Sequence, residues 1–291
     1  MNLKYENTLF KNNYSIQING KLMDFSTAKV MGILNLTPDS FYDGGKYINN
    51  EQLILSQVEK MLAEGADIID IGAFSSKPGS QLISVKEEEE RLLPALRSII
   101  KSFPEAIISV DTVRAEIAKK SVEHGASIIN DISAGKYDDK MFETVAKLNV
   151  PYILMHMQGD PENMQVKPTY KSVYNEVFHF FTEKLHQLNK VGVKDVILDP
   201  GFGFGKTLAH NYELLKMQKG LHRLNCPLLA GLSRKGMIQK ELDVSANEAL
   251  NGTTAANVIA LLNGANILRV HDVKEAVEAI NIVNLLNQAK N

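Results

Sequence analysis

The sequence has little cysteine and no long apolar run. Cys226 is the only cysteine among 291 residues, so an internal disulfide framework is excluded. It stands next to Pro227 at the start of an apolar run, which favours a buried small side chain over a nucleophile. No stretch approaches the roughly 18 apolar residues of a membrane span. The first 13 residues lack the apolar core of a signal peptide, so we expect a cytoplasmic protein with no membrane partner.

No charge of either sign predominates. Lys and Arg total 32, Asp and Glu total 34, and the formal net charge is −2. The overall field therefore gives no reason to expect nucleic acid as a partner, although a local basic pocket for an acidic substrate is compatible with it. The chain also lacks a Pro- or Gly-rich linker, so we predict a single domain over residues 1–291.

One pattern recurs along the chain: a short apolar run, a polar or glycine-containing turn, and a segment with helical periodicity. Glu51–Glu64, Val85–Lys101 and Val273–Gln288 are such helical segments. Runs that are apolar throughout are typical of parallel strands covered by helices. The eight runs are Lys29–Leu34, Asp67–Ile71, Ala106–Val110, Ser127–Ile129, Pro151–Met155, Asp195–Leu198, Pro227–Ala230 and Asn266–Val270.

Eight such units in about 250 residues predict an α/β fold, a single (β/α)8 TIM barrel. A doubly wound open sheet is the structural alternative. The 28 residues before the first unit are expected to form a short N-terminal hairpin across the barrel floor.

Polar side chains follow nearly every predicted strand. Any one of them could be a turn former or a helix cap. Together they predict an active site, because TIM-barrel sites form at the carboxyl ends of the strands. The candidates are Asn35, Asp111, Asn130, Asp131, His156, Asp199, Ser233, Arg234, Lys235, Arg269 and His271.

These candidates divide into two chemical groups. Asp111, Asn130 and Asp199 suit the edge of a flat nitrogen heterocycle, because Asp accepts from two N–H groups and Asn both donates and accepts. The other group offers positive charge for phosphate, pyrophosphate or carboxylate, and consists of Lys235, Arg269 and His271. The combination indicates a heterocycle that carries an anionic group.

The segment Gly201–Thr207, GFGFGKT, ends like a phosphate-binding loop. Pro200 stands where such a loop needs its first glycine, so we interpret the segment as a flexible loop that exposes Phe202 and Phe204. Exposed aromatic faces could stack on a planar substrate or cover the core.

Two further motifs have structural interpretations. Glu87–Glu90 is interpreted as a solvated helix face, because four consecutive residues point around a helix instead of converging on a metal. Met155–Met157, MHM, has no second histidine or cysteine at ligand spacing, so no zinc site is predicted.

The segment Met31–Gly45, MGILNLTPDSFYDGG, resembles the first signature of dihydropteroate synthases over its whole length. The likeness covers roughly residues 29 to 275, and the first signature and the SRK element are specific to this family. The later segments match in order: Ser109–Thr112, Ile129–Asp131, Met155–Met157, Asp199–Lys206, Ser233–Lys235 and Arg269–Asp272.

The resemblance implies a (β/α)8-barrel transferase of folate biosynthesis. Such an enzyme joins 6-hydroxymethyl-7,8-dihydropterin pyrophosphate to p-aminobenzoate, with release of pyrophosphate and formation of 7,8-dihydropteroate. Members of the family are typically homodimers that use Mg²⁺, and sulfonamides target them as mimics of p-aminobenzoate.

The resemblance also implies roles for the matched residues, with Asp111, Asp199 and Lys235 as the catalytic group. The pterin would contact Asp111, Asn130, Asp199 and Lys235. The pyrophosphate would contact Asn35, Ser76, Arg269 and His271, with Asn35 also the magnesium ligand. The p-aminobenzoate would contact Ser76, Pro78, Phe204 and Lys235. Either Met155 or Met157 would pack on the pterin face.

The sequence departs from the family pattern at two places. The second signature, usually GGESTRPG, reads GAFSSKPG, so Phe74 replaces a glutamate and Lys77 replaces an arginine and its bidentate fork. Gly236 follows Lys235 where serine is common, which removes a hydroxyl from the implied p-aminobenzoate carboxylate site. Backbone N–H groups at that helix start could still hold the carboxylate.

Three alternatives remain open from the sequence. A methyltetrahydrofolate:corrinoid methyl-transfer module would share the pterin contacts but should lack the first signature and the SRK element. A catalytically silent pterin-binding relative is compatible with the altered second signature. A Schiff-base aldolase could use Lys235 at a barrel strand end.

Overall fold

Eight parallel strands form the central sheet of the computed structural model, which describes residues 14–36, 51–74 and 82–289. Each strand overlaps one predicted apolar run. The strands are β3 Lys29–Asn35, β4 Ile68–Gly72, β5 Ile107–Asp111, β6 Ile128–Asp131, β7 Tyr152–Met155, β8 Val196–Asp199, β9 Leu229–Ala230 and β10 Ile267–Val270.

The sheet closes on itself. Its hydrogen-bonded order is β8-β7-β6-β5-β4-β3-β10-β9, so β8 and β9 stand at its two ends. Leu198 of β8 donates its N–H to the Pro227 carbonyl at 2.9 Å and forms a parallel bridge with Leu228, directly before β9. The predicted (β/α)8 barrel is therefore confirmed, and the open doubly wound sheet is excluded.

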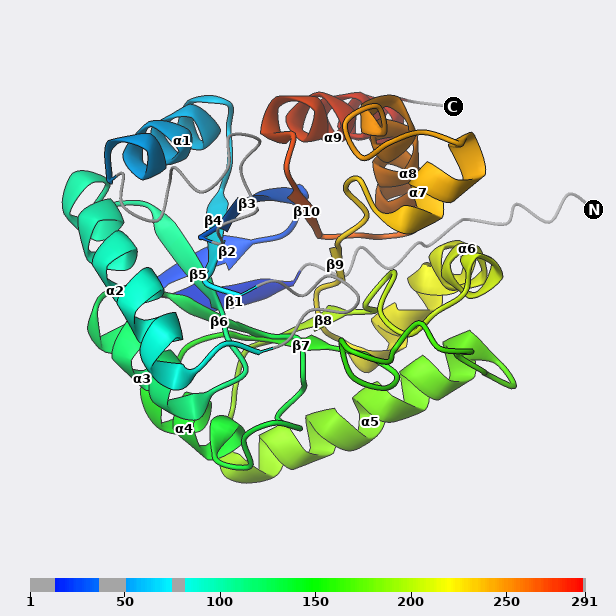
Figure 1. Ribbon diagram of the computed structural model, residues 1–291. Coiled ribbons are helices and arrows are strands. Elements are labelled where there is room, and N and C mark those ends of the chain that lie inside the picture. The colour runs from blue at the N-terminus through cyan, green and yellow to red at the C-terminus, as the bar shows by residue number, and fades with distance from the viewer. Residues whose placement is uncertain (1–13, 37–50, 75–81, 290–291) are drawn as a thin grey trace, which may run out of the picture.

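Helices surround the strands (Figure 1). α9 has the predicted bounds, α1 ends one residue earlier than predicted and α2 one residue later. In the described ranges, none of them combines the length and the apolar character needed to cross a membrane. They are α1 Glu51–Ala63, α2 Val85–Ser102, α3 Ala115–Glu123, α4 Met141–Leu148, α5 Val173–Val191, α6 Leu208–Met217, the 3₁₀ helix η1 Gln218–Leu224, α7 Gly236–Leu242, α8 Leu250–Leu262 and α9 Val273–Gln288.

The predicted hairpin fills the barrel floor. β1 Ser15–Ile18 and β2 Lys21–Asp24 pair antiparallel through Asn19 and Gly20, whose positive φ angles of 50° and 76° suit a two-residue hairpin turn. Apolar side chains of the hairpin pack against one inward side chain from most barrel strands. This floor cluster contains Tyr14, Ile16, Ile18, Phe25, Met31, Ile68, Ile128, Ile153, Ile197, Leu229 and Ile267.

Strand alternation places polar residues above this floor. Successive side chains of a strand point to opposite faces, so the second residue after an inward one also points inward. Two positions beyond Ile68 of the floor cluster lies Asp70, and two beyond Ile267 lies Arg269. The same rule gives Asn130 after Ile128 and Asp199 after Ile197. The residues between them, such as Ile69 and Leu198, pack in the core under the helices.

Candidate active site

Three predicted site residues meet around a fourth that the strand-end pattern missed. Arg269 donates from Nε to Asp70 Oδ2 at 2.7 Å, and its Nη2 lies 2.6 Å from the same oxygen. Arg269 Nη2 also lies 3.3 Å from Asp111 Oδ2. Asn130 Nδ2 donates to Asp70 Oδ2 at 3.1 Å. Asp70 therefore orients both Arg269 and Asn130 inside the barrel.

The two carboxylates of this cluster still have acceptor capacity. Within the described residues, Asp70 Oδ1 and Asp111 Oδ1 are buried without a hydrogen-bond partner. Burial and, after it, repulsion from Asp70 raise the pKa of Asp111 to about 8, against the opposing charge of the Arg269 guanidinium. Buried acceptors without donors are costly, so this arrangement suits a ligand that brings N–H groups.

Lys235 and Asp199 lie beside the loop that follows β8. Lys235 precedes α7, and its ammonium donates to the Phe202 carbonyl and sits 4.7 Å from the centroid of the Phe204 ring. Burial lowers the pKa of Lys235 to about 8, against the opposing charge of Asp199. Burial also raises the pKa of Asp199, and Lys235 is the main group that opposes the rise. The two side chains therefore stabilise each other's charged form.

The prediction that both loop phenylalanines are exposed was half wrong. Phe202 has no exposed surface and belongs to the core beneath the helices. Phe204 is half-buried and packs against an apolar cluster at the mouth of the barrel. Only Phe204 can therefore offer a ring face to a ligand.

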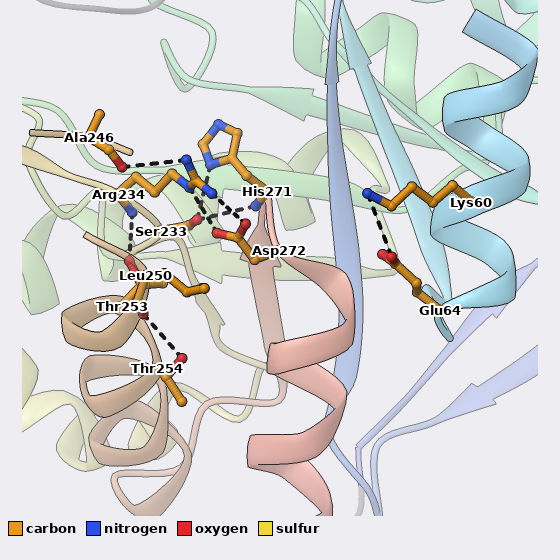
Figure 2. A network of polar contacts seen from close by, with 10 residues as sticks. All are labelled: Lys60, Glu64, Ser233, Arg234, Ala246, Leu250, Thr253, Thr254, His271 and Asp272. Atoms are coloured by element: carbon orange, nitrogen blue, oxygen red, sulfur yellow. Dashed lines mark hydrogen bonds and ion pairs between the residues drawn. The ribbon is translucent and has the colours of Figure 1, made fainter. Parts of the chain in front are cut away.

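A polar network joins the loops that carry Lys235 and His271 (Figure 2). Ser233 Oγ lies 3.0 Å from His271 Nδ1 and accepts the His271 N–H at 3.2 Å. Arg234 donates from Nε and Nη2 to the two oxygens of Asp272 at 2.9 and 2.6 Å, and its backbone N–H donates to Thr253 Oγ1 at 3.0 Å. Ion pair and hydroxyl together fix His271 relative to the SRK segment.

Two other predicted strand-end residues have structural partners. Asp131 is fully buried and accepts from the Tyr152 hydroxyl and from Ser133 and Gly135, so it fastens the turn after β6. His156 is buried, and burial holds its pKa well below the ordinary value, so the ring is neutral. Neither side chain belongs to the Asp70 cluster.

Comparisons with known proteins decide the family. Residues 31–271 match the sequence model of the family described as pterin binding enzyme. The chain is 45% identical to the dihydropteroate synthase of Escherichia coli (strain K12) over 273 residues, which is 93% of this chain and 96% of that relative. The chain belongs to the dihydropteroate synthase family.

Solved structures of dihydropteroate synthases agree with this assignment. The Yersinia pestis enzyme with a sulfonamide drug complex superimposes with a TM-score of 0.90 at 42% identity, covering 95% of this chain and 100% of that one. The Xanthomonas albilineans enzyme with 4-aminobenzoic acid gives a TM-score of 0.88 at 34% identity, covering 96% of this chain and 100% of that one. As a family member, the chain is a transferase.

Several residues of the dihydropteroate synthase signatures lie outside the described residues. These are the first signature after Leu36, the predicted contacts Ser76 and Pro78, and Lys77, one of the departures from the family pattern. Asn35, which ends β3, is described and is half-buried.

Phe74, one departure from the family pattern, lies in an apolar wall at the mouth of the barrel. It is 4% exposed and clusters with Val113, Ile132 and Met155. Met157 and Phe204 pack against the same cluster. A glutamate in this environment would bury a carboxylate among apolar side chains, so the substitution is consistent with the local packing.

The glutamate run on α2 was only partly predicted. Glu90 is exposed and pairs with Lys86, as a solvated face requires. Glu88, however, has no exposed surface, accepts from the Thr112 hydroxyl at 2.6 Å and pairs with Arg114. The interpretation of the whole run as a solvated face was therefore wrong for Glu88. Arg114 also donates to the Ile83 carbonyl. The Glu88–Arg114 pair therefore connects the start of α2 to Thr112, the residue that follows Asp111.

Proposed function

We propose that this chain condenses 6-hydroxymethyl-7,8-dihydropterin pyrophosphate with p-aminobenzoate to form 7,8-dihydropteroate and pyrophosphate. The observation that carries the proposal is the inward-facing cluster of Asp70, Asp111, Asn130 and Arg269 next to Lys235. It combines unpartnered buried acceptors for a pterin edge with cations for a pyrophosphate. The relatives add support, since solved members hold a sulfonamide drug and 4-aminobenzoic acid.

The pterin side of the site would use the acidic half of the cluster. Asp111 and Asp199 would accept N–H groups of the ring, and Asn130 would donate and accept beside them. Met155, which is 2% exposed, and the half-buried Met157 lie in the apolar wall and could pack on a pterin face. A flat heterocycle would thus bind between an apolar wall and polar strand ends.

The leaving pyrophosphate would meet the cationic half. Arg269 Nη1 makes no hydrogen bond to any residue in the described ranges, so that edge of the guanidinium could take a phosphate oxygen. His271 is exposed at the end of β10 and held by Ser233. Neutralising the growing charge of the leaving group lowers the barrier to its departure.

Magnesium is the cofactor that the family resemblance implies. Mg²⁺ usually takes only one or two protein oxygens and completes its shell with substrate phosphates and water. The Asn35 amide supplies one such oxygen, so the residues present fit an ion carried mainly by the pyrophosphate. When bound, it would withdraw charge from the departing pyrophosphate.

The chemical step would proceed without a covalent enzyme intermediate. The C–O bond between the pterin methylene and the pyrophosphate breaks, and the electron pair leaves with the pyrophosphate. The amine nitrogen of p-aminobenzoate then forms the C–N bond and releases a proton. Asp111 and Asp199, when ionised, would stabilise the intervening pterin cation electrostatically. A pterin covalently attached to the protein after trapped turnover would contradict this route.

A steady-state assay tests the function. With both substrates and Mg²⁺, we expect equal amounts of pyrophosphate and dihydropteroate, and no product after chelation of the metal. Binding of the pterin substrate without product would instead identify a silent pterin-binding relative. The cause of the missing activity would then lie outside the Asp70 cluster, because the geometry of this cluster is intact.

Restoring a serine at Gly236 is expected to strengthen p-aminobenzoate binding. Gly236 is exposed at the start of α7, and a Cβ added there meets no atom within 4 Å, so Gly236→Ser fits without strain. We expect a KM for p-aminobenzoate about threefold lower or better, in line with one added hydrogen bond. Gly236→Ala is the matched control, because it changes the backbone freedom without adding a hydroxyl. Equal KM values for the Ser and Ala variants would contradict the prediction.

We also propose that the chain forms a homodimer through α8 and α9. These neighbouring helices expose five large apolar side chains, spaced three or four residues apart on each helix. They are Ile259, Leu262, Ile282, Leu285 and Leu286, with exposures of 45–65%. Apolar side chains gathered on adjacent elements are typical of a protein interface.

Leu285→Glu is expected to convert the dimer into a monomer in sedimentation velocity. Leu285 is 65% exposed, so the substitution costs little in the monomer but buries charge in the proposed interface. Leu22→Glu, on the floor hairpin at 74% exposure, should leave the dimer unchanged. A monomeric unmodified protein, or a dimer that tolerates Leu285→Glu, would contradict the assignment.

A further inference from the structure

Lys206 is a buried cation that the proposed reaction does not use. It ends the loop after β8 and is 2% exposed. Its ammonium has three N–H donors, and three acceptors surround it at hydrogen-bond distance. Gly201 O lies at 2.9 Å, Phe204 O at 3.0 Å and His156 Nδ1 at 3.0 Å, with His156 O further away at 3.4 Å. Donors and close acceptors are therefore matched one to one.

The loop is wound tightly around this ammonium. Gly201 and Gly205 have φ angles of +67° and +61°, in the left-handed region. A Cβ at Gly201 would lie 1.9 Å from the His156 carbonyl oxygen, and one at Gly205 would lie 2.2 Å from that of Gln158. The glycines therefore let the loop press on the segment after β7, and the Lys206 ammonium reaches one of these two carbonyls, that of His156, at 3.4 Å.

The same loop shapes the surroundings of Lys235. The Phe202 carbonyl accepts from the Lys235 ammonium, and the Phe204 ring lies 4.7 Å from it. Two carbonyls of the loop, from Gly201 and Phe204, are held by Lys206. A continuous path of contacts thus runs from Lys206 through the loop to Lys235.

Burying the Lys206 ammonium costs free energy unless its charge and its N–H donors are used by neighbouring groups. Burial lowers the pKa of Lys206 to about 7, which reflects the penalty on its charged form. The neutral His156 ring offers Nδ1 as an acceptor and reduces that penalty. An apolar side chain of similar length would fill the space at lower cost but would leave three acceptors unpaired.

We propose that Lys206 is a positioning residue for the p-aminobenzoate side of the site. Its ammonium holds the Gly201–Gly205 loop in the shape that presents the Phe204 ring and the Phe202 carbonyl to Lys235. This inference rests on the proposed function, because its kinetic test measures p-aminobenzoate. It assigns Lys206 no contact with either substrate.

Lys206→Met tests the role, with Lys136→Met as the matched control. Lys136 lies near the same end of the barrel, but it is exposed and pairs with Asp160 on the surface. Lys206→Met is expected to raise the KM for p-aminobenzoate about tenfold or more, while the KM for the pterin substrate changes less than about threefold. Lys136→Met should change neither. Equal rises in both KM values, or no rise, would overturn the proposal.

A coupling measurement separates positioning from general destabilisation. If Lys206 acts in part through the Phe204 ring, the rises caused by Phe204→Ala and Lys206→Met should be less than additive in the double variant. Additive rises in the KM for p-aminobenzoate would contradict the path. His156→Leu removes one acceptor and keeps the lysine, so a smaller rise in the same direction is expected even if Lys206→Met does not fold. An unchanged KM in His156→Leu would also contradict it.

Amide hydrogen exchange gives a readout that needs no turnover. The Phe204 N–H donates to Gly201 O at 3.1 Å, and the Gly203 N–H to Asn211 Oδ1 at 2.7 Å. Both amides should exchange faster in Lys206→Met than in Lys136→Met. If the unmodified protein forms no dihydropteroate, the proposed function fails while this comparison still tests the loop. If the protein is active and the two Met variants exchange alike, the positioning role fails alone.

Discussion

Arg269→Met is expected to lower the free energy of unfolding by about 3–5 kcal/mol and to abolish most of the activity. The guanidinium contacts the buried carboxylates of Asp70 and Asp111. Removing it leaves both acidic side chains inside the barrel without their cationic partner, and a buried acidic group that loses its partner is among the costliest changes in a protein. The same substitution removes the cation proposed for the pyrophosphate, so kcat/KM should fall by about 100-fold or more.

Two further variants make the Arg269 prediction specific. Arg97→Met, on the exposed side of α2, makes the same chemical change and should alter stability by less than about 0.5 kcal/mol. Adding Asp70→Asn to Arg269→Met removes one orphaned charge, so part of the stability should return without activity. Chemical denaturation gives the free energies, and the assay gives the rates. An Arg269→Met protein as stable as the unmodified chain would show that the ion pairs contribute nothing net.

Asp111→Asn is expected to stabilise the protein at alkaline pH while lowering kcat/KM by about 100-fold or more. The pKa of Asp111 is about 8 in the folded protein, against 3.8 for an unperturbed carboxyl. The folded chain therefore binds this proton more tightly than the unfolded chain, so stability falls as pH rises from about 4 to about 8. An asparagine has no proton to lose, so its advantage should be largest above pH 8 and shrink at lower pH.

The same pKa predicts how substrate capture depends on pH. A pterin that donates N–H groups to Asp111 binds the ionised carboxylate, which makes up half of the population near pH 8 and most of it only at higher pH. We therefore expect kcat/KM for the pterin substrate to rise with pH, to reach half of its maximum near pH 8 and to level off only above that pH. Asp111→Asn should lack this rise. A flat profile in the unmodified protein, or the same rise in the variant, would assign the titration to another group.

The strands were predictable because each is an uninterrupted apolar run between turn residues. The strand-end residues followed from barrel geometry, which gathers carboxyl ends at one mouth. Asp70 was missed because it lies inside β4, two residues before the strand ends at Gly72, whereas the predicted site residues stand at or just past the strand ends. Its signal was present: an acidic residue at an inward position of an otherwise apolar strand.

Glu88 and Phe202 were misjudged for a different reason. Composition alone made Glu88 one of four equivalent glutamates, and only the position of Arg114 and Thr112 shows which of them turns inward. Phe202 and Phe204 alternate in a glycine-rich loop, and the direction of each ring depends on how tightly that loop presses against its neighbour. Long-range packing decides these cases, and a single sequence does not contain it.

The floor hairpin has a consequence for traffic through the molecule. Ile16, Ile18 and Phe25 pack into the amino-terminal end of the barrel, so this end is closed. Both reactants and both products must then pass through the same open end of the barrel, where Phe204 and Lys235 lie. A molecule bound at this open end blocks entry to the interior of the barrel and exit from it. Binding at the rim and exchange with the interior therefore exclude each other.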